Sequence, residues 1–546
     1  MTGTTPWEEL VTSALLGTDR RTPPADIRAP GQDAPLALLD AAALHTLRRR
    51  AGLLPARAAA RPEPAPHDDR REPPAPARRR LTQLLADRTA PVGSGGRRGT
   101  APDLTELLPQ WLTAANDHGY RAPAAALPAL LDAAHVRNDL RPRVLAFAGP
   151  RGLWLARLNP DWKFALRGGS GGAVLPDAWD TEAVRELWER GLFAERVALL
   201  AAVRARDANA ARALLATTWP TERAEDRLMF LDSLRAGLSD LDEPFLEESL
   251  SDRSRNVRAT AAELLSALPN SALAGRMAAR AATCVSLDRT GGPTGATVVV
   301  EAPHECDADM QRDGVSPTPP TGRGERSWWL GQLVEATPLS VWPDRLGGRT
   351  PEEIVTLPVL DGWTDELHAA WCRAAVRQRD AHWAHALLGP PAASPATGPG
   401  ASSLAERAKL LATLPTAERA DWVAGFIAAH GLSEAFQLLG VCAVPWSEPL
   451  GRAVVDALDI ARDGGSYPWS FSGVMGLAER CLNPAEASRL EILTATPDES
   501  EGSSPGAGGY WSEAFQRLVS TLRLRAAMLS ELAGEDAAGA SGPAGD

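Results

Sequence analysis

Two pairs of side chains at helical spacing are the best candidates for metal chemistry in this sequence. His368 and Cys372 are four residues apart, and His382 and His385 are three apart. Each pair therefore shares one face of a helix, as metal ligands on a helix can. No glycine or proline interrupts residues 365–388, which predicts one continuous helix. At 1.5 Å per residue the two pairs would sit roughly 21 Å apart, too far to share an ion. We therefore expect these side chains to pack between helices, and we predict no metal and no cofactor.

Motifs for nucleophilic or phosphate chemistry are weaker still. Gly168–Gly172 (GGSGG) formally matches a GxSxG elbow, but Pro176 follows too soon for the helix that such an elbow requires, and a flexible tether is favoured. A P-loop needs lysine after glycine, whereas Lys163 follows Trp and Lys409 follows Ala. The run His304–Asp309 collects metal-ligand types, yet nothing supplies a second, rigid cluster. We predict no catalytic residue, and the sequence leans toward a protein that is not an enzyme.

Partner binding is the other chemistry that the residues suggest. Asp19 and Arg20 form a polar turn after a first helix, where they are placed to contact a partner. Trp154 and the pair Trp328-Trp329 fall at irregular junctions, where an exposed indole would anchor a partner. The simpler interpretation makes the turn a helix end and the indoles part of the core. The candidate partner-binding residues are therefore Asp19, Arg20, Trp154, Trp328 and Trp329.

Charge and cysteine usage exclude several classes of protein. The 546 residues carry a formal net charge of −12, which argues against a general binder of nucleic acid or anionic membranes. No stretch approaches the roughly 20 apolar residues of a membrane-spanning helix. The five cysteines are scattered and never form a CxxC pair, which is typical of reduced thiols in a cytoplasmic protein.

One basic stretch stands against this acidic background. Residues 48–98 hold thirteen arginines and five acidic residues. No aromatic residues are interleaved with them to stack on bases, so a solvated basic linker is favoured over an arm that binds an acidic partner.

The clearest structural signal is a helix–turn–helix unit at residues 222–269. Apolar residues recur at helical spacing on both sides of a turn: Leu228, Leu231, Leu234 and Leu238 before it, and Val257, Ala261, Leu264 and Leu268 after it. Asp252 and Arg258 stand where a HEAT-type repeat carries its Asp and Arg. Because one helix pair cannot bury its own apolar face, such units occur stacked. The alternative is an ordinary helical hairpin in a non-repeating α domain.

Composition and periodicity divide the chain into helical segments and inserts rich in Pro, Gly and Arg. The predicted helical segments are 1–54 (N-terminal helices), 102–176, 177–290 (HEAT-like repeats), 327–390, 403–495 (C-terminal repeats) and 510–533 (a last helix). The predicted disordered inserts, linkers and tail are 55–101 (basic), 291–326 (mostly disordered), 391–402, 496–509 and 534–546. The sequence thus predicts an all-α fold, a HEAT-like α-solenoid or helical repeat array with disordered inserts.

Several short stretches, spread over nearly the whole chain, resemble the uncharacterised bacterial family DUF5691. They are 7–11 (WEELV) with 14–20 (ALLGTDR), 151–155 (RGLWL) with 159–162 (NPDW), 242–247 (DEPFLE) with 252–254 (DRS), and 328–330 (WWL) with 337–339 (TPL). The resemblance implies a HEAT-like α-solenoid with no established activity, and it carries over no catalytic residue. It also implies that the gene for such a protein lies beside the genes for a MoxR-type ATPase, a von Willebrand A-type protein and a SWIM zinc-finger protein.

The function expected from these observations is a cytoplasmic, non-enzymatic α-solenoid scaffold or adaptor that binds protein partners. The resemblance names a MoxR-type ATPase or a von Willebrand A-type protein as possible partners. The first alternative is a HEAT-like protein that binds nucleic acid, which would need a basic concave face. The second is a hydrolase with an unrecognised acid or histidine cluster.

Overall fold

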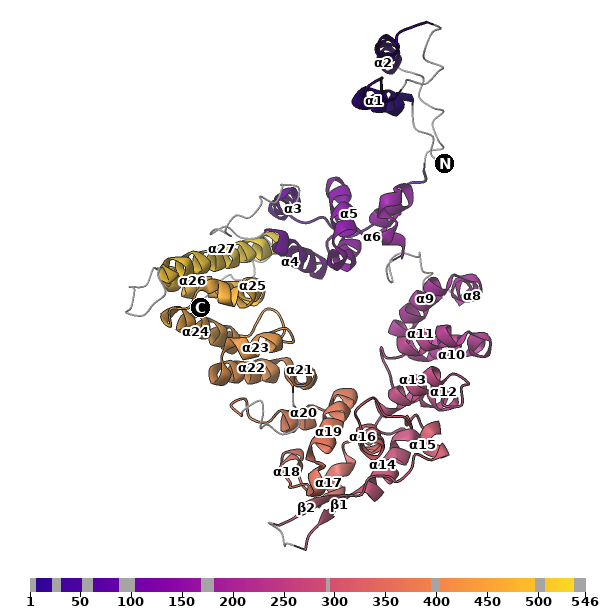
Figure 1. The fold of residues 1–546 in the computed structure, drawn as a ribbon, viewed down its shortest axis with the longest axis vertical. Helices are drawn as coiled ribbons and strands as arrows, with labels where there is room; N and C mark the ends of the chain where they lie inside the picture. Colours follow the sequence, from indigo (N-terminus) through magenta and orange to yellow (C-terminus); the bar gives the residue numbers. More distant parts are fainter. Residues whose placement is uncertain are drawn as a thin grey trace, which may run out of the picture. The chain divides into compact units, whose positions relative to one another are not determined.

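The structure is a computed structural model of the chain. It describes residues 6–21, 31–51, 62–87, 104–167, 181–290, 295–393, 403–495 and 506–534. The chain divides into two compact units, Met1–Ala65 and Pro66–Asp546. Nearly all elements are helices, most of them α-helices and the others short 3-10 turns (Figure 1), so the all-α prediction is confirmed.

The first unit contains two helices that pack on each other, α1 (Pro6–Leu16) and α2 (Ala34–Arg50). Leu10, Ala37 and Ala41 are buried, whereas large apolar side chains such as Leu15 and Leu39 are exposed.

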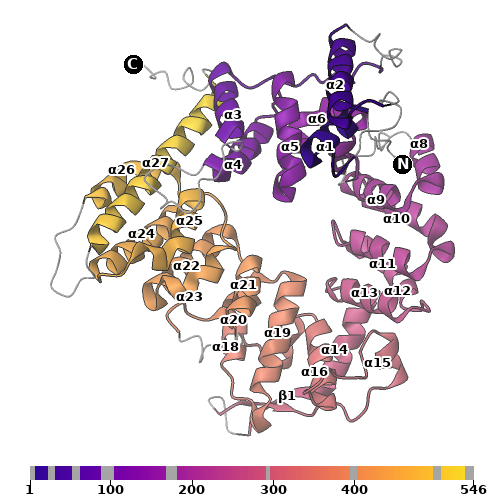
Figure 2. The same ribbon diagram turned by 45° about the horizontal axis from the view of Figure 1, so that its top comes forward.

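The second unit begins with a helical block that the last helix of the chain completes. Its elements are α3 (Ala75–Asp87), α4 (Leu104–Asp117), α5 (Leu127–Val136), α6 (Arg141–Leu158), α7 (Phe164–Arg167) and, from the far end of the chain, α27 (Ala507–Ala533). The core of this block surrounds Trp111 and includes Met528 and Leu532 of α27. In Figures 1 and 2, α27 lies beside α4 and beside α25 (Ser472–Cys481) and α26 (Ala487–Leu490).

Two sequence-based expectations are wrong in this block. Residues 55–101 were expected to be a disordered basic insert, but 62–87 are described and include α3. Arg70 fixes the extended part of this segment, because its Nη1 donates to the carbonyl oxygens of Ala146 (2.8 Å) and Tyr120 (3.3 Å). Trp154 was expected at an irregular junction. Instead α6 continues to Leu158 after a kink at Gly149, whose φ is +57°.

A run of helices follows with a recurrent packing pattern. The elements are α8 (Thr181–Arg190), α9 (Phe193–Arg206), α10 (Ala208–Thr218), α11 (Ala224–Ser233), α12 (Glu243–Ser249), α13 (Arg255–Ser266) and α14 (Ala272–Cys284). Helix α9 packs against α11, and α11 against α13. The Asp and Arg of the HEAT-type pattern meet at the α12–α13 turn, where Arg258 Nη1 donates to the carbonyl oxygen of Asp252 (2.7 Å) and the Asp252 carboxylate pairs with Arg227 (2.8 Å).

Two short strands interrupt the helices. β1 (Val285–Asp288) and β2 (Thr297–Val300) form an antiparallel pair with Val285 opposite Val300 and Asp288 opposite Thr297. The helical segment predicted for 177–290 is too long at its end, because α14 ends at Cys284 and β1 follows it.

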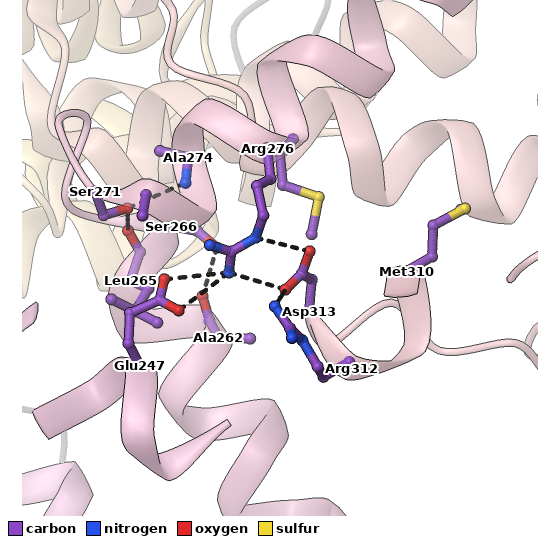
Figure 3. Close-up of polar contacts among 12 residues, drawn as sticks. Glu247, Ala262, Leu265, Ser266, Ser271, Ala274, Arg276, Met310, Arg312 and Asp313 are labelled. Carbon is purple, nitrogen blue, oxygen red and sulfur yellow. Dashed lines mark hydrogen bonds and ion pairs between the residues drawn. The ribbon is translucent and has the colours of Figure 1, made fainter. Parts of the chain in front are cut away.

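The segment 291–326, which contains β2, was expected to be mostly disordered, and this is wrong for residues 295–326. It contains α15 (Ala308–Arg312) and is held by Asp313, whose side chain is 1% exposed. The Asp313 carboxylate accepts hydrogen bonds from Arg276 (2.9 and 3.0 Å) and Arg280 (2.7 Å), and Arg276 also pairs with Glu247 of α12 (Figure 3). These contacts join the segment to α12 and α14, which local sequence patterns do not reveal.

The remaining helices continue the same packing. They are α16 (Glu325–Ala336), α17 (Val341–Arg345), α18 (Pro351–Val355), α19 (Thr364–Gln378), α20 (Ala381–Leu388), α21 (Leu404–Thr413), α22 (Thr416–His430), α23 (Leu432–Leu439), α24 (Glu448–Asp463), α25 (Ser472–Cys481) and α26 (Ala487–Leu490). Helix α16 packs on α14 and α19, and α21 packs on α19 and α23. Within the described ranges, none of the helices is long and apolar enough to cross a membrane.

The predicted continuous helix at residues 365–388 is wrong. Arg379 adopts a left-handed conformation with φ of +54° and ends α19. Asp380 then caps α20, its carboxylate accepting from the backbone N–H of Trp383 (3.0 Å). The roughly 21 Å separation of the two ligand pairs therefore no longer follows from helix length. The described residues still contain no group of three His, Cys, Asp or Glu placed to hold a metal.

Candidate binding groove

A groove of about 860 Å³ opens along the helices α13, α16, α19 and α21 of the second unit. Its floor is apolar and includes Leu264, Leu268 and Val376. Its walls carry five cationic side chains, Arg235, Arg373, Arg377, Arg379 and Lys409, and three acidic ones, Glu263, Glu335 and Glu406. The groove thus has an excess of positive charge in a chain whose net charge is −12.

Three of the cations are already paired. Arg373 Nε lies 2.5 Å from Glu335 Oε2, and Arg377 pairs with the other oxygen of the same carboxylate. These two ion pairs join α19 to α16. Arg235 forms a two-point pair with Glu263, both distances being 3.0 Å. Hydrogen bonds to Glu263, and next to Asp232, hold the pKa of Arg235 above its usual value. Glu335 and Glu263 are therefore neutralised within the groove.

The other two cations are exposed and unpaired. Arg379 and Lys409 form no hydrogen bond or ion pair with any residue that the structure describes. Arg379 stands at the break between α19 and α20, and Lys409 is on α21. Since the chain contains only two lysines against many arginines, a lysine at this position is unusual. These two groups are available to an anionic partner.

The sulfur and imidazole groups near the groove are poor catalysts. Burial raises the pKa of the Cys372 thiol to about 12, so the thiol is protonated at neutral pH and is a weak nucleophile. His368, one turn earlier, is buried beside Trp371 with ring centroids 5.7 Å apart. Burial lowers the pKa of His368, which keeps the imidazole neutral. Both groups behave as parts of the core.

The structure does not bring the five candidate partner-binding residues together. Asp19 and Arg20 are exposed in the turn after α1, in the first unit, where the backbone N–H of Arg20 donates to Gly17 (3.1 Å). Trp154 is half-buried within α6.

Trp328 and Trp329 both lie on α16, and their indoles hold the chain itself. Trp328 donates to the carbonyl oxygen of Ser316 (3.0 Å) and Trp329 to that of Pro317 (2.9 Å). These bonds attach the segment before α16 to the helix.

Sequence reasoning missed the groove because its residues come from four helices far apart in the chain. One local signal was present: Asp380 is a good N-cap residue, and it marks the helix start that leaves Arg379 outside both helices. The scarcity of lysine also made Lys409 unusual, but nothing in the sequence placed it beside α13 and α19.

Comparison with known proteins gives one match. The model of a family described as a family of unknown function, DUF5691, matches residues 9–532, nearly the whole chain. No curated protein and no solved structure is significantly similar to the chain.

Proposed function

Since the chain belongs to DUF5691, a family of unknown function, we propose a function from its own geometry. The protein is a non-enzymatic scaffold or adaptor, built as a HEAT-like α-solenoid, that binds an acidic segment of a partner protein in the groove along α13, α16, α19 and α21. The observation that carries this proposal is the pair of unpaired cations, Arg379 and Lys409, beside an apolar floor.

The solenoid part of the proposal is supported by recurrent packing. Helices α9, α11 and α13 contact in succession, and so do α14, α16, α19 and α21. Arg258 and Asp252 meet at the turn of the unit that first suggested HEAT-type repeats. Helices stacked in this way expose one helix of each pair along a common surface, which such proteins use for binding.

The chemistry of the partner is supported by charge complementarity. An acidic segment with apolar side chains would satisfy both cations and cover Leu264, Leu268 and Val376. The resemblance to DUF5691 suggests a MoxR-type ATPase or a von Willebrand A-type protein as the source of that segment. The five cysteines, all within the described residues, form no disulfide, which supports a reducing compartment such as the cytoplasm.

The test is a pull-down of the tagged full-length chain from its native lysate, with and without ATP, followed by partner identification. The double variant Arg379→Glu/Lys409→Glu is expected to lose a partner that the unchanged chain retains. The matched control is Lys163→Glu/Arg253→Glu, which makes the same change in net charge at exposed positions away from the groove. Equal recovery with both variants would refute binding in the groove, and a lone, monodisperse protein would refute the scaffold.

Nucleic acid remains the second candidate, because the same cations fit phosphates. The net charge of −12 opposes it. Duplex DNA retained at a physiological ionic strength of roughly 0.15 M, and lost in the groove variant, would favour this alternative.

A further inference from the structure

A second groove, of about 610 Å³, lies between α4, α27 and the loop that carries Pro445. Its lining is largely apolar and includes Pro109, Trp111, Val444, Pro445, Met528 and Leu532. The volume is in the range of small-molecule sites, roughly 300–1,000 Å³. We call it the α4–α27 groove.

Arg525 of α27 gives this groove a buried positive charge. The residue is 5% exposed, and its Nη1 donates to the carbonyl oxygens of Glu479 (3.2 Å) and Leu482 (2.6 Å). Among the described residues, no carboxylate pairs with it, and its Nε and Nη2 form no hydrogen bond. Arg204, equally buried, has the carboxylate of Asp242 at 2.7 Å. A buried charge without a counter-ion is costly, and a ligand anion would compensate it.

Two residues that line the α4–α27 groove also carry a buried donor without an acceptor. The indole Nε1 of Trp111 and the amide Nε2 of Gln110 are both buried and have no hydrogen-bond partner in the part of the chain that the structure describes. Buried donors are normally paired, so each is a place where a ligand acceptor would be stabilised. Arg525 and Trp111 carry donors only, and the Gln110 amide adds its Nε2 donor beside the acceptor Oε1.

The carboxylates at the edge of the groove do not fill this need. Glu106 pairs with Arg480 at 3.3 Å, and Asp139 pairs with Arg137 at 2.7 Å. The third, Asp117, is exposed. All three are rim groups.

We propose that the α4–α27 groove is a binding site for an apolar monocarboxylate, a molecule with one carboxylate on a hydrocarbon chain or ring. The carboxylate oxygens accept from Arg525 and from the donors of Gln110 and Trp111. The hydrocarbon part lies along Met528 and Leu532. An alcohol of the same shape leaves the guanidinium charge uncompensated, and a cation of the same shape is repelled by it.

The test is calorimetric titration of the full-length chain with decanoate below its micelle concentration, compared with decanol and decyltrimethylammonium. Decanoate is expected to bind at one saturable site, at least about tenfold more tightly than decanol. Arg525→Met is expected to abolish this preference. The control is Arg523→Met on the same helix, whose guanidinium is exposed, pairs with Glu491 and does not line the groove.

Two milder variants keep the proposal testable where Arg525→Met fails to fold. Gln110→Met keeps the side-chain volume but removes the amide donor, and it is expected to weaken decanoate binding about tenfold. Leu529→Glu places a negative charge at an exposed position of the groove wall, and it is expected to weaken decanoate but not decanol. Three results would each overturn the proposal: no saturable decanoate binding, equal binding of decanol, or decanoate binding unaffected by all three variants.

Discussion

The phenolic hydroxyl of Tyr120 donates a 2.8 Å hydrogen bond to the backbone carbonyl oxygen of Leu532, 412 residues later in the chain. A second link lies close by, where Arg80 of α3 pairs with Glu531 at 2.7 Å. Helix α27 therefore completes the block of α3 to α6 rather than adding a separate element. The same helix carries Arg525, so this long-range packing also builds the α4–α27 groove.

Removing the Tyr120 hydroxyl is expected to destabilise this block. Tyr120→Phe keeps the buried ring but leaves the Leu532 carbonyl without its donor, which should lower the free energy of unfolding by about 1–2 kcal/mol. The measurement is thermal or urea unfolding followed together with protease sensitivity of residues 104–167. An unchanged midpoint and unchanged cleavage would mean that water replaces the hydroxyl at no cost.

Asp313 is expected to matter more, because its single buried carboxylate pairs with Arg280 and with Arg276, the second of which Figure 3 shows. In Asp313→Asn the charge of Arg280 loses its counter-ion and Arg276 keeps only Glu247, so we expect a loss of about 3 kcal/mol. Residues 302–324 should become sensitive to protease, since this network ties them to α12 and α14. The matched control is Glu263→Gln, which breaks an exposed pair with Arg235 and should cost at most about 1 kcal/mol. Equal losses in the two variants would contradict this ranking.

The Asp313 carboxylate is also expected to make the stability of the fold depend on pH. Burial alone would raise the pKa of Asp313, but hydrogen bonds from Arg276 and Arg280 outweigh it and hold the pKa below the ordinary 3.8. The unfolded state therefore takes up the proton first as pH falls. The stabilisation is complete above about pH 4 and is lost as pH falls toward the lowered value. Melting temperatures measured from about pH 6 to pH 3 should fall less steeply for Asp313→Asn than for the unchanged chain. Parallel curves would show that Asp313 does not titrate in this way.

The helices were predictable because their signals are local. Leu231 and Leu234 mark one stripe and Leu264 and Leu268 another, and all four are buried. The order of residues 295–326 was not predictable, because it depends on side chains elsewhere. Arg276 and Arg280 reach this segment from α14, and the indole of Trp328 reaches it from α16. A segment rich in Pro and Gly with no apolar period gives no sign of such partners.

The candidate sites show the same limit. The sequence singled out Trp328 and Trp329 as unusual, and the structure gives each indole an acceptor within the chain. The sequence could not indicate that Arg379 and Lys409 line one groove, because only the packing of α19 on α21 brings them together. In the sequence, Arg525 looks like an ordinary polar residue of an amphipathic helix. Only its burial in the structure distinguishes it from the other arginines of the same helix.

The cysteines give a final prediction, which bears on whether the groove along α13, α16, α19 and α21 performs thiol chemistry. Burial raises the pKa of Cys372 to about 12 and that of Cys442 to about 11, and it also raises the pKa of Cys284, Cys306 and Cys481. Because only the thiolate reacts, the native chain should react slowly with Ellman's reagent at about pH 8, while the denatured chain releases five equivalents. Fast modification of one thiol in the native chain, lost in Cys372→Ser but not in Cys442→Ser, would instead identify Cys372 as a reactive group in the groove. Uniformly slow modification would leave the groove as a surface for binding.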